Sequence, residues 1–234
     1  MQISLIIPCY NEAENIPLII QKLYPLYQDK SFEIIFVENG SNDNSLSILK
    51  AYKSKIPNFN FISIKNNKGY GYGIVQGLKI AKGQYLAWTH ADMQTNPLDI
   101  LKGLRLIEGN QTKFFIKGLR KGRKISDSFF TFGMSIFASF NLGYFLWDIN
   151  AQPSIFPSSF FKDWVDPPND FSLDLYAYFQ AKRQGYTIKR FDVNFGKRIF
   201  GVSKWNFNFY SRINFIRRNL LYILEISNRY KKWK

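Results

Sequence analysis

The stretch Ile3-Ser4-Leu5-Ile6-Ile7-Pro8, followed by a helical pattern over residues 14–27, decides the fold class of this chain. The first run is short and apolar, as in a buried strand, whereas residues 14–27 carry isoleucine and leucine at helical spacing. The same alternation predicts strands at 32–37, 60–64, 85–88 and 114–117, and helices at 45–53, 73–81 and 172–184. Strands that alternate with helices are typical of parallel β-α-β units. The predicted fold class is therefore α/β, with a mostly parallel central sheet flanked by helices.

Length and charge bound the class of protein. A chain of 234 residues favours one domain with appendages, and 32 basic against 17 acidic side chains give a net charge of +15. Such a surface attracts polyanions, which include nucleic acid, anionic lipid and phosphorylated substrates. No recognised nucleic-acid module organises the basic residues, so we expect no nucleic-acid partner. The single cysteine, Cys9, excludes an internal disulfide, and we expect it to be a small packed side chain.

Three segments bear on location. The stretch Met1-Gln2-Ile3-Ser4 leads directly into the apolar strand pattern, so we expect no signal peptide and a cytoplasmic protein. Residues 129–147 are uncharged but interrupted by glycine, serine and asparagine, which predicts one or two helices against protein or at a membrane surface. Residues 205–234 are amphipathic, and from Lys197 onward ten basic residues stand against Glu225 alone. This segment predicts peripheral binding to an anionic membrane, on its cytoplasmic face.

Polar clusters follow the predicted strands, where ligands bind in open α/β sheets. They are Pro8-Cys9-Tyr10-Asn11-Glu12, residues 38–45, the glycine-rich residues 66–73, and His90-Ala91-Asp92-Met93-Gln94. Each has an ordinary alternative: Asn11 and Glu14 have the spacing of a helix capping box, and residues 38–45 contain an Asn-Gly turn. Residues 66–73 lack the Lys-Ser/Thr pair of a phosphate loop.

The last cluster places a histidine, an aspartate and a glutamine at every second residue. On a strand, alternate side chains share a face, so His90, Asp92 and Gln94 are candidates to converge on one cation or phosphate-bearing ligand. The alternative is a polar strand end that runs into the turn at Thr95-Asn96-Pro97.

Taken in order, these four clusters closely resemble the motifs of the family 2 glycosyltransferases with the GT-A fold. The subgroup most similar transfers sugars to polyprenyl or dolichyl phosphate, and the resemblance extends to residues 148–153, 170–185 and 201–204. Two positions depart from the family pattern. Val37-Glu38-Asn39 stands where the family has Val-Asp-Asp, and His90 stands at the first acidic position of the Asp-x-Asp motif.

The resemblance implies a donor site for a nucleotide-diphosphate sugar, UDP- or GDP-linked, and a divalent cofactor, Mg²⁺ or Mn²⁺. Asp92 would hold the metal against the diphosphate, with Gln94 beside it. Three outcomes stay open: a metal site of Asp92 and Gln94, a Mn²⁺ site that includes His90, or a degenerate enzyme with weak or no turnover. The nucleotide-sugar-binding residues it implies are Pro8, Tyr10, Glu12, Glu38, Asn39, Asn67, Gly69, Ala91 and Asp92.

The resemblance also implies an acceptor site. A phosphate acceptor is largely ionised at neutral pH, whereas a hydroxyl needs a base, for which Asp174 is the first candidate and Asp170 the second. The phosphate- and acceptor-binding residues would be Arg120, Arg123, Asp148, Gln152, Arg198, Ser203 and Lys204. The basic residues 113–124, Lys117 among them, are predicted to hold phosphates.

The resulting prediction is an inverting, metal-dependent glycosyltransferase, with Asp92 and Asp174 as its catalytic residues and polyprenyl phosphate as its acceptor. Residues 1–204 would form the GT-A domain, with a nucleotide-binding half (1–110) and an acceptor half (111–204), and residues 205–234 the basic C-terminal segment. The alternatives are transfer to a glycan or lipid hydroxyl in cell-envelope synthesis, and a catalytically weak nucleotide-sugar binding or scaffold protein. A homo-oligomer is compatible with either.

Overall fold

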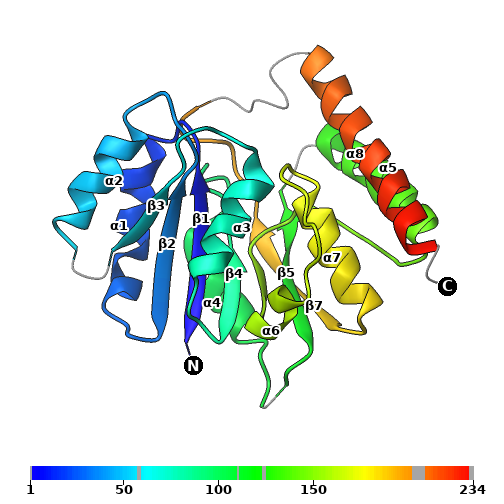
Figure 1. The fold of residues 1–234 in the computed structure, drawn as a ribbon, viewed down its shortest axis with the longest axis horizontal. Helices are drawn as coiled ribbons and strands as arrows, with labels where there is room; N and C mark the ends of the chain where they lie inside the picture. The colour runs from blue at the N-terminus through cyan, green and yellow to red at the C-terminus, as the bar shows by residue number, and fades with distance from the viewer. Residues whose placement is uncertain (1, 57–58, 110, 123–124, 202–208, 232–234) are drawn as a thin grey trace.

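A seven-stranded mixed sheet forms the centre of the molecule (Figure 1). The computed structural model describes residues 2–56, 59–109, 111–122, 125–201 and 209–231. The strand order is β3-β2-β1-β4-β6-β5-β7, in which β6 is antiparallel to both neighbours and the other pairs are parallel. The strands are β1 (Ile3–Cys9), β2 (Phe32–Glu38), β3 (Asn60–Ser63), β4 (Tyr85–Trp88), β5 (Phe114–Lys121), β6 (Ser154–Pro157) and β7 (Thr187–Asn194).

Helices cover both faces of the sheet, because alternate residues of each strand point to opposite faces. Leu5 and Ile7 of β1 pack with Ile16 and Leu23 in one apolar core, whereas Ile6 packs in the other. The helices are α1 (Asn15–Tyr27), α2 (Ser45–Lys53), α3 (Tyr70–Ile80), the 3-10 turn η1 (Pro97–Asp99), α4 (Ile100–Leu104), α5 (Ile125–Leu142), α6 (Ser158–Lys162), α7 (Leu173–Arg183) and α8 (Phe209–Lys231).

The predicted α/β class and the strands of the first half are confirmed. Helix α3 begins at Tyr70 instead of Gly73, since the glycine-rich stretch itself enters the helix. The strands β6 and β7 were not predicted, because β6 is preceded by Pro153 and ends in Pro157, and β7 carries Lys189, Arg190 and Asp192 inside it. Cys9 is fully buried, as predicted.

The capping-box reading of Asn11 and Glu14 is wrong. Glu14 is the N-cap residue of α1 and makes no side-chain cap hydrogen bond. Asn11 instead has a φ of 55°, and its Oδ1 accepts a hydrogen bond from the Asn42 backbone N–H at 2.9 Å. Asn11 therefore links the loops that follow β1 and β2.

Helices α5 and α8 lie side by side at one end of the molecule (Figure 1). Ser227 Oγ of α8 donates a hydrogen bond to the Asn141 carbonyl of α5 at 2.8 Å. The uncharged residues 129–147 thus include the C-terminal end of α5, which packs on α8. This agrees with the predicted helix that lies against protein. Among the residues that the structure describes, no helix combines the length and apolar character needed to cross a membrane.

Candidate active site

The loops after β1 and β2 are joined by hydrogen bonds at the carboxyl edge of the sheet. The backbone N–H groups of Asn11 and Glu12 donate to the hydroxyls of Ser41 and Ser45, both at 3.0 Å. The backbone N–H of Ala13 donates to Asp43 Oδ2 at 3.0 Å. The polar residues that follow the two strands therefore serve first to fix the shape of this edge. The half-buried Pro8 and Tyr10 lie in the same segment.

Glu38 and Asn39 end β2 and are both buried. Glu38 accepts hydrogen bonds from the Ser41 backbone N–H and from Ser63 Oγ, so both of its oxygens have partners inside the protein. Asn39 Nδ2 donates to the Gly69 carbonyl at 2.9 Å, while its Oδ1 is buried without a partner among the described residues. A buried acceptor without a partner is costly, so Asn39 is the better placed of the two to accept a hydrogen bond from a ligand.

The glycine-rich residues contact a loop from the second half of the chain. A Cβ at Gly71 would lie 2.3 Å from the Pro168 carbonyl oxygen, and the Tyr72 backbone N–H donates to the Asn169 carbonyl at 3.0 Å. Gly69 has a φ of 111°, and the exposed Asn67 accepts from its N–H at 2.8 Å. These glycines are therefore required for a close approach of backbone to backbone, as well as for any ligand.

Asp92, Gln94 and Arg198 form a polar cluster after β4. Arg198 Nη2 lies 2.9 Å from Asp92 Oδ2, and Arg198 Nε donates to Gln94 Oε1 at 3.3 Å. Asp92 Oδ1 accepts from the Gln94 backbone N–H at 3.1 Å, and the neighbouring Ala91 is buried. The Asp92 carboxylate and the Gln94 amide oxygen already contact one positively charged group, the Arg198 guanidinium. Such hard oxygens are the ligands that Mg²⁺ and Mn²⁺ prefer, so the cluster fits a divalent ion.

No set of three or more histidine, cysteine, aspartate or glutamate side chains is arranged for a metal within the described ranges. A divalent cation here would therefore complete its coordination with oxygens from the ligand or from water. His90 is half-buried, and its ring stacks on Tyr70, with the centroids 5.4 Å apart; Tyr70 in turn stacks on Phe171 at 4.6 Å. Burial lowers the pKa of His90, which favours the neutral imidazole.

Glu12 lies at the rim of the same cluster. Its carboxylate accepts a hydrogen bond from Asn15 Nδ2, and its Oε1 lies 4.0 Å from Arg198 Nη1. Burial raises the pKa of Glu12 to about 7, and the negative charge of Asp92 adds to this effect. We therefore expect Glu12 to exchange a proton near neutral pH.

Asp174 is wholly buried at the start of α7 and is surrounded by donors. Trp88 Nε1 donates to its Oδ1 at 3.2 Å, and Gln152 Nε2 donates to the same atom at 3.3 Å. Lys117 Nζ lies 3.9 Å from this oxygen and donates to Ser154 Oγ at 3.1 Å. Lys117 is also fully buried, and burial lowers its pKa to about 8 although the Asp174 charge acts in the opposite direction.

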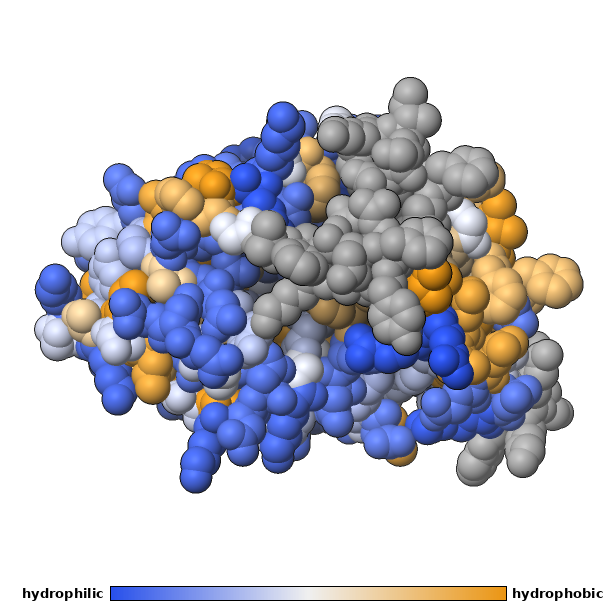
Figure 2. Space-filling model, turned by 90° about the horizontal axis from the view of Figure 1, so that it is seen from above, coloured by the Kyte–Doolittle hydropathy of each residue, from blue (hydrophilic) through white to orange (hydrophobic). Residues whose placement is uncertain are grey.

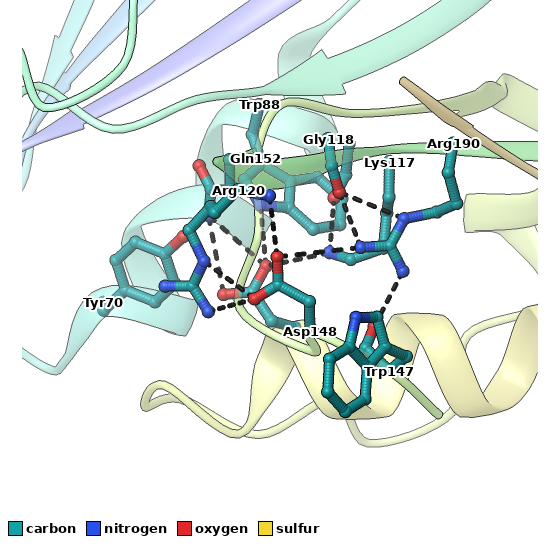
Figure 3. Close-up of polar contacts among 11 residues, drawn as sticks. Tyr70, Trp88, Lys117, Gly118, Arg120, Trp147, Asp148, Gln152 and Arg190 are labelled. Carbon is teal, nitrogen blue, oxygen red and sulfur yellow. Dashed lines mark hydrogen bonds and ion pairs between the residues drawn. The ribbon is translucent and has the colours of Figure 1, made fainter. Parts of the chain in front are cut away.

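A second buried ion pair lies beside the first (Figure 3). Arg120 Nε donates to Asp148 Oδ1 at 2.8 Å, and the Arg120 backbone N–H donates to Oδ2 at 2.9 Å. Arg190 lies 3.9 Å from Asp148 on the other side and donates to the carbonyls of Gly118 and Trp147, both at 2.7 Å. Burial raises the pKa of Asp148, but Arg120 and Arg190 outweigh this and keep it below the usual value. Gln152 Oε1 is buried without a partner in the described residues.

Among the described residues, the structure brings the predicted donor and acceptor residues to one edge of the sheet, but some of them are paired or buried. Arg120 and Arg198, predicted to bind phosphate, are paired with Asp148 and Asp92. Lys117 is buried against Asp174 and is not a surface phosphate ligand, because it continues the inward-facing side of β5. Arg123, Ser203 and Lys204 lie outside the described residues.

Sequence reasoning missed Tyr70, Trp88 and Arg190 as parts of the site. Lys117 gave a usable signal, since it follows the apolar run Phe114-Phe115-Ile116 without a break. A lysine that continues a buried strand needs a carboxylate partner. Arg190 gave no signal, because the strand that carries it was not predicted.

Comparison with known proteins identifies the family. The sequence model described as Glycosyl transferase family 2 matches residues 4–146 of the 234, so the chain belongs to this family. The uncharacterised glycosyltransferase YfnE of Bacillus subtilis (strain 168) is 34% identical over 119 residues, which cover 51% of this chain and 30% of YfnE. An undecaprenyl-phosphate 4-deoxy-4-formamido-L-arabinose transferase of Yersinia enterocolitica is 32% identical over 103 residues, 42% of this chain and 31% of that protein. These matches span about a third of the relatives' length.

Solved structures show the fold. Glucosyl-3-phosphoglycerate synthase from Mycobacterium tuberculosis, in complex with Mn²⁺, UDP and glucosyl-3-phosphoglycerate, superposes with a TM-score of 0.73 at 15% identity, over 97% of this chain and 79% of that one. The mannosyltransferase PcManGT from Pyrobaculum calidifontis, in complex with GDP-Man and Mn²⁺, gives a TM-score of 0.65 at 16% identity, over 98% and 69%. The chain has the GT-A fold, as predicted.

Replacement of Glu12 by glutamine tests the electrostatics of the rim. The folded state binds a proton on Glu12 up to about pH 7, whereas the unfolded chain releases it near pH 4.5, so stability is lost as the pH rises between these values. Glu12→Gln removes this loss. We expect urea unfolding at pH 8 to show a gain of up to about 3 kcal/mol, and at pH 4.5 almost no change. The exposed Glu14→Gln is the control, and an equal effect at both pH values would contradict the account.

Replacement of Lys117 by methionine tests the buried ion pair. It leaves Asp174 buried without its cation, so we expect the free energy of unfolding to fall by about 3–5 kcal/mol. Adding Asp174→Asn should then recover part of the loss, which makes the two changes non-additive in a double-mutant cycle. Lys121→Met, which breaks the exposed pair with Asp192, should change stability by about 1 kcal/mol or less. Additive losses for Lys117 and Asp174 would show that the pair is not coupled.

Proposed function

We propose that the chain is an inverting, metal-dependent glycosyltransferase that moves a sugar from a nucleotide-diphosphate donor to polyprenyl phosphate at the cytoplasmic face of a membrane. The observation that carries this proposal is the buried carboxylate of Asp92 in the loop after β4. The Arg198 guanidinium contacts this carboxylate, and Gln94 lies beside it. Family membership and the UDP, GDP-Man and Mn²⁺ named for the solved neighbours support the donor class and the cofactor.

The donor would lie along the carboxyl ends of β1, β2 and β4. Asn39 Oδ1 would accept a hydrogen bond from the base, Tyr10 would stack on it, and Glu12 would contact the ribose. Pro8, Glu38, Asn67, Gly69 and Ala91 would shape the pocket. A divalent cation held by Asp92 and Gln94 would neutralise the charge that develops on the departing diphosphate.

The acceptor would approach from the side of Asp148, Gln152 and Asp174. A phosphate oxygen attacks the anomeric carbon in line with the bond to the diphosphate, the new C–O bond forms as the old one breaks, and the configuration inverts. Arg120 and Arg198 would orient phosphate oxygens, since a guanidinium fork matches them. Arg123, Ser203 and Lys204 would add to this acceptor site. The undecaprenyl-phosphate transferase among the relatives supports a polyprenyl phosphate acceptor.

The second candidate is transfer to a glycan or lipid hydroxyl, which Gln152 Oε1 favours, because this buried acceptor has no partner among the described residues and a hydroxyl can donate to it. A hydroxyl has a proton to lose, and we propose Asp174 as the carboxylate that accepts it. Asp174→Asn would abolish transfer to a hydroxyl and only moderately slow transfer to a phosphate.

Membrane contact is proposed for the helix pair α5 and α8. Figure 2 shows apolar side chains gathered at this end of the molecule. Phe140 is 87% exposed, Phe145 72% and Leu221 54%, and Arg217 lines an apolar groove on α8. Exposed apolar groups with nearby cations suit an anionic lipid surface. Residues 205–234 are proposed to act as this basic appendage to the GT-A domain of residues 1–204.

A ligand panel tests the donor. We expect one nucleotide series among UDP-, GDP- and dTDP-sugars to raise the melting temperature when Mn²⁺ or Mg²⁺ is present, because binding to the folded state alone stabilises it. Asp92→Asn should remove the metal-dependent part of the shift, whereas Asp99→Asn, a change at the buried carboxylate of η1, should keep it. No response of the folded protein to any donor would contradict the proposal.

Vesicle sedimentation tests the membrane surface. Binding to vesicles that contain phosphatidylglycerol should fall as the salt concentration rises, because screening weakens the attraction. The double variant Ile136→Ser/Phe140→Ser on α5 should bind several-fold more weakly. Tyr24→Ser, at an aromatic of α1 that is as exposed as Ile136, should bind as the wild type does. If vesicle binding changes neither with salt concentration nor with the α5 substitutions, the α5–α8 surface is not the membrane-binding surface.

A further inference from the structure

Arg198 contacts the two side-chain oxygens that the proposed function assigns to the metal as ligands. Its guanidinium contacts Asp92 Oδ2 at 2.9 Å and Gln94 Oε1 at 3.3 Å. The side chains of Arg198 and Asp92 are only 24% and 8% exposed, so the pair is shielded from water. The Coulomb attraction between the two charges is therefore screened less than it would be on the surface.

The segment that carries Arg198 is hydrogen-bonded to Gln94. The Gly196 backbone N–H donates to the Gln94 carbonyl at 2.7 Å, and Gln94 Nε2 donates to the Gly196 carbonyl at 3.1 Å. Farther along, Asn15 Nδ2 donates to the Phe200 carbonyl at 3.4 Å. The contact of Arg198 with Asp92 is thus one of several between the segment after β7 and the loop after β4.

A guanidinium and a divalent cation compete when both use Asp92 Oδ2 and Gln94 Oε1, the two oxygens that Arg198 contacts. A Mn²⁺ or Mg²⁺ held by the same two oxygens would be close to the Arg198 guanidinium, and the two positive charges would repel each other. Metal binding would therefore favour a conformation in which Arg198 leaves Asp92. The displaced guanidinium needs another anion, and the donor's diphosphate is the anion that arrives at this position in the proposed function.

We propose that Arg198 is the internal counter-ion of Asp92 in the nucleotide-free protein, and that it passes from Asp92 to the diphosphate when metal and nucleotide bind together. This inference rests on the proposed function and adds a binding order to it. Metal alone must break the Arg198–Asp92 pair without compensation and binds weakly. Metal with nucleotide restores a partner to Arg198, so each ligand raises the affinity for the other by the same factor.

Titration with Mn²⁺ alone, followed by electron paramagnetic resonance, tests the inference. We expect Arg198→Gln to bind Mn²⁺ about tenfold or more tightly than the wild type, because Asp92 loses its competing cation. Lys197→Gln removes the same charge from the exposed neighbour on the same segment and should leave Mn²⁺ affinity nearly unchanged. Arg198→Lys should lie between the wild type and Arg198→Gln, and it serves as the second variant should Arg198→Gln fail to fold.

Repeating the titration with UDP and GDP separates the inference from the function. The nucleotide that binds should strengthen Mn²⁺ binding of the wild type, and of Arg198→Gln by a smaller factor. The inference would be overturned if the wild type and both Arg198 variants bind Mn²⁺ alone with equal affinity while nucleotide binding stays intact. That result would leave the proposed function standing. Failure of the folded wild type to bind any nucleotide with Mn²⁺ would overturn the proposed function itself.

Discussion

The parallel pairing of β1 with both β2 and β4 is the constraint on which the rest of the structure depends. Ile6 is in register with Ile35 of β2 and with Trp88 of β4, so three strands end at one edge of the sheet. Backbone hydrogen bonds fix this register, and a slip by one residue would exchange the side chains that β1 sends into the two apolar cores. Polar residues that are 30 to 80 positions apart in the sequence are adjacent only because of this pairing.

Each buried carboxylate assigned to the reaction is paired with a basic side chain from the second half of the chain. Asp92 pairs with Arg198, Asp148 with Arg120, and Asp174 with Lys117. Buried charges need such partners, since an unpaired one would cost several kcal/mol. In the proposed function, Arg198 and Arg120 would exchange these carboxylates for phosphates of the donor and the acceptor, whereas the buried Lys117 would stay with Asp174. The two arginine pairs would then connect the stability of the site with recognition of its ligands.

The sequence predicted the first half of the fold closely and the second half only in part. Strand β1 is recognisable as a short continuous apolar run, and helix α1 by its isoleucine and leucine residues at helical spacing. Strand β7 carries Lys189, Arg190 and Asp192, whose neutralisation depends on residues far along the chain, and no local pattern reveals it. Asp92 was recognisable from its place after a buried strand. Its partner Arg198 was recognisable only as a basic residue near the phosphates, because the pairing follows from how the segment after β7 crosses the sheet.

The pairing between these two residues also gives the most direct test of the account. A crystal structure of the protein with Mn²⁺ and the nucleoside diphosphate that stabilises it would show which cation occupies Asp92. The account predicts the metal on Asp92 and Gln94, with the Arg198 guanidinium moved onto a phosphate oxygen. A structure in which the nucleotide is bound while Arg198 still contacts Asp92, with the metal elsewhere, would contradict it.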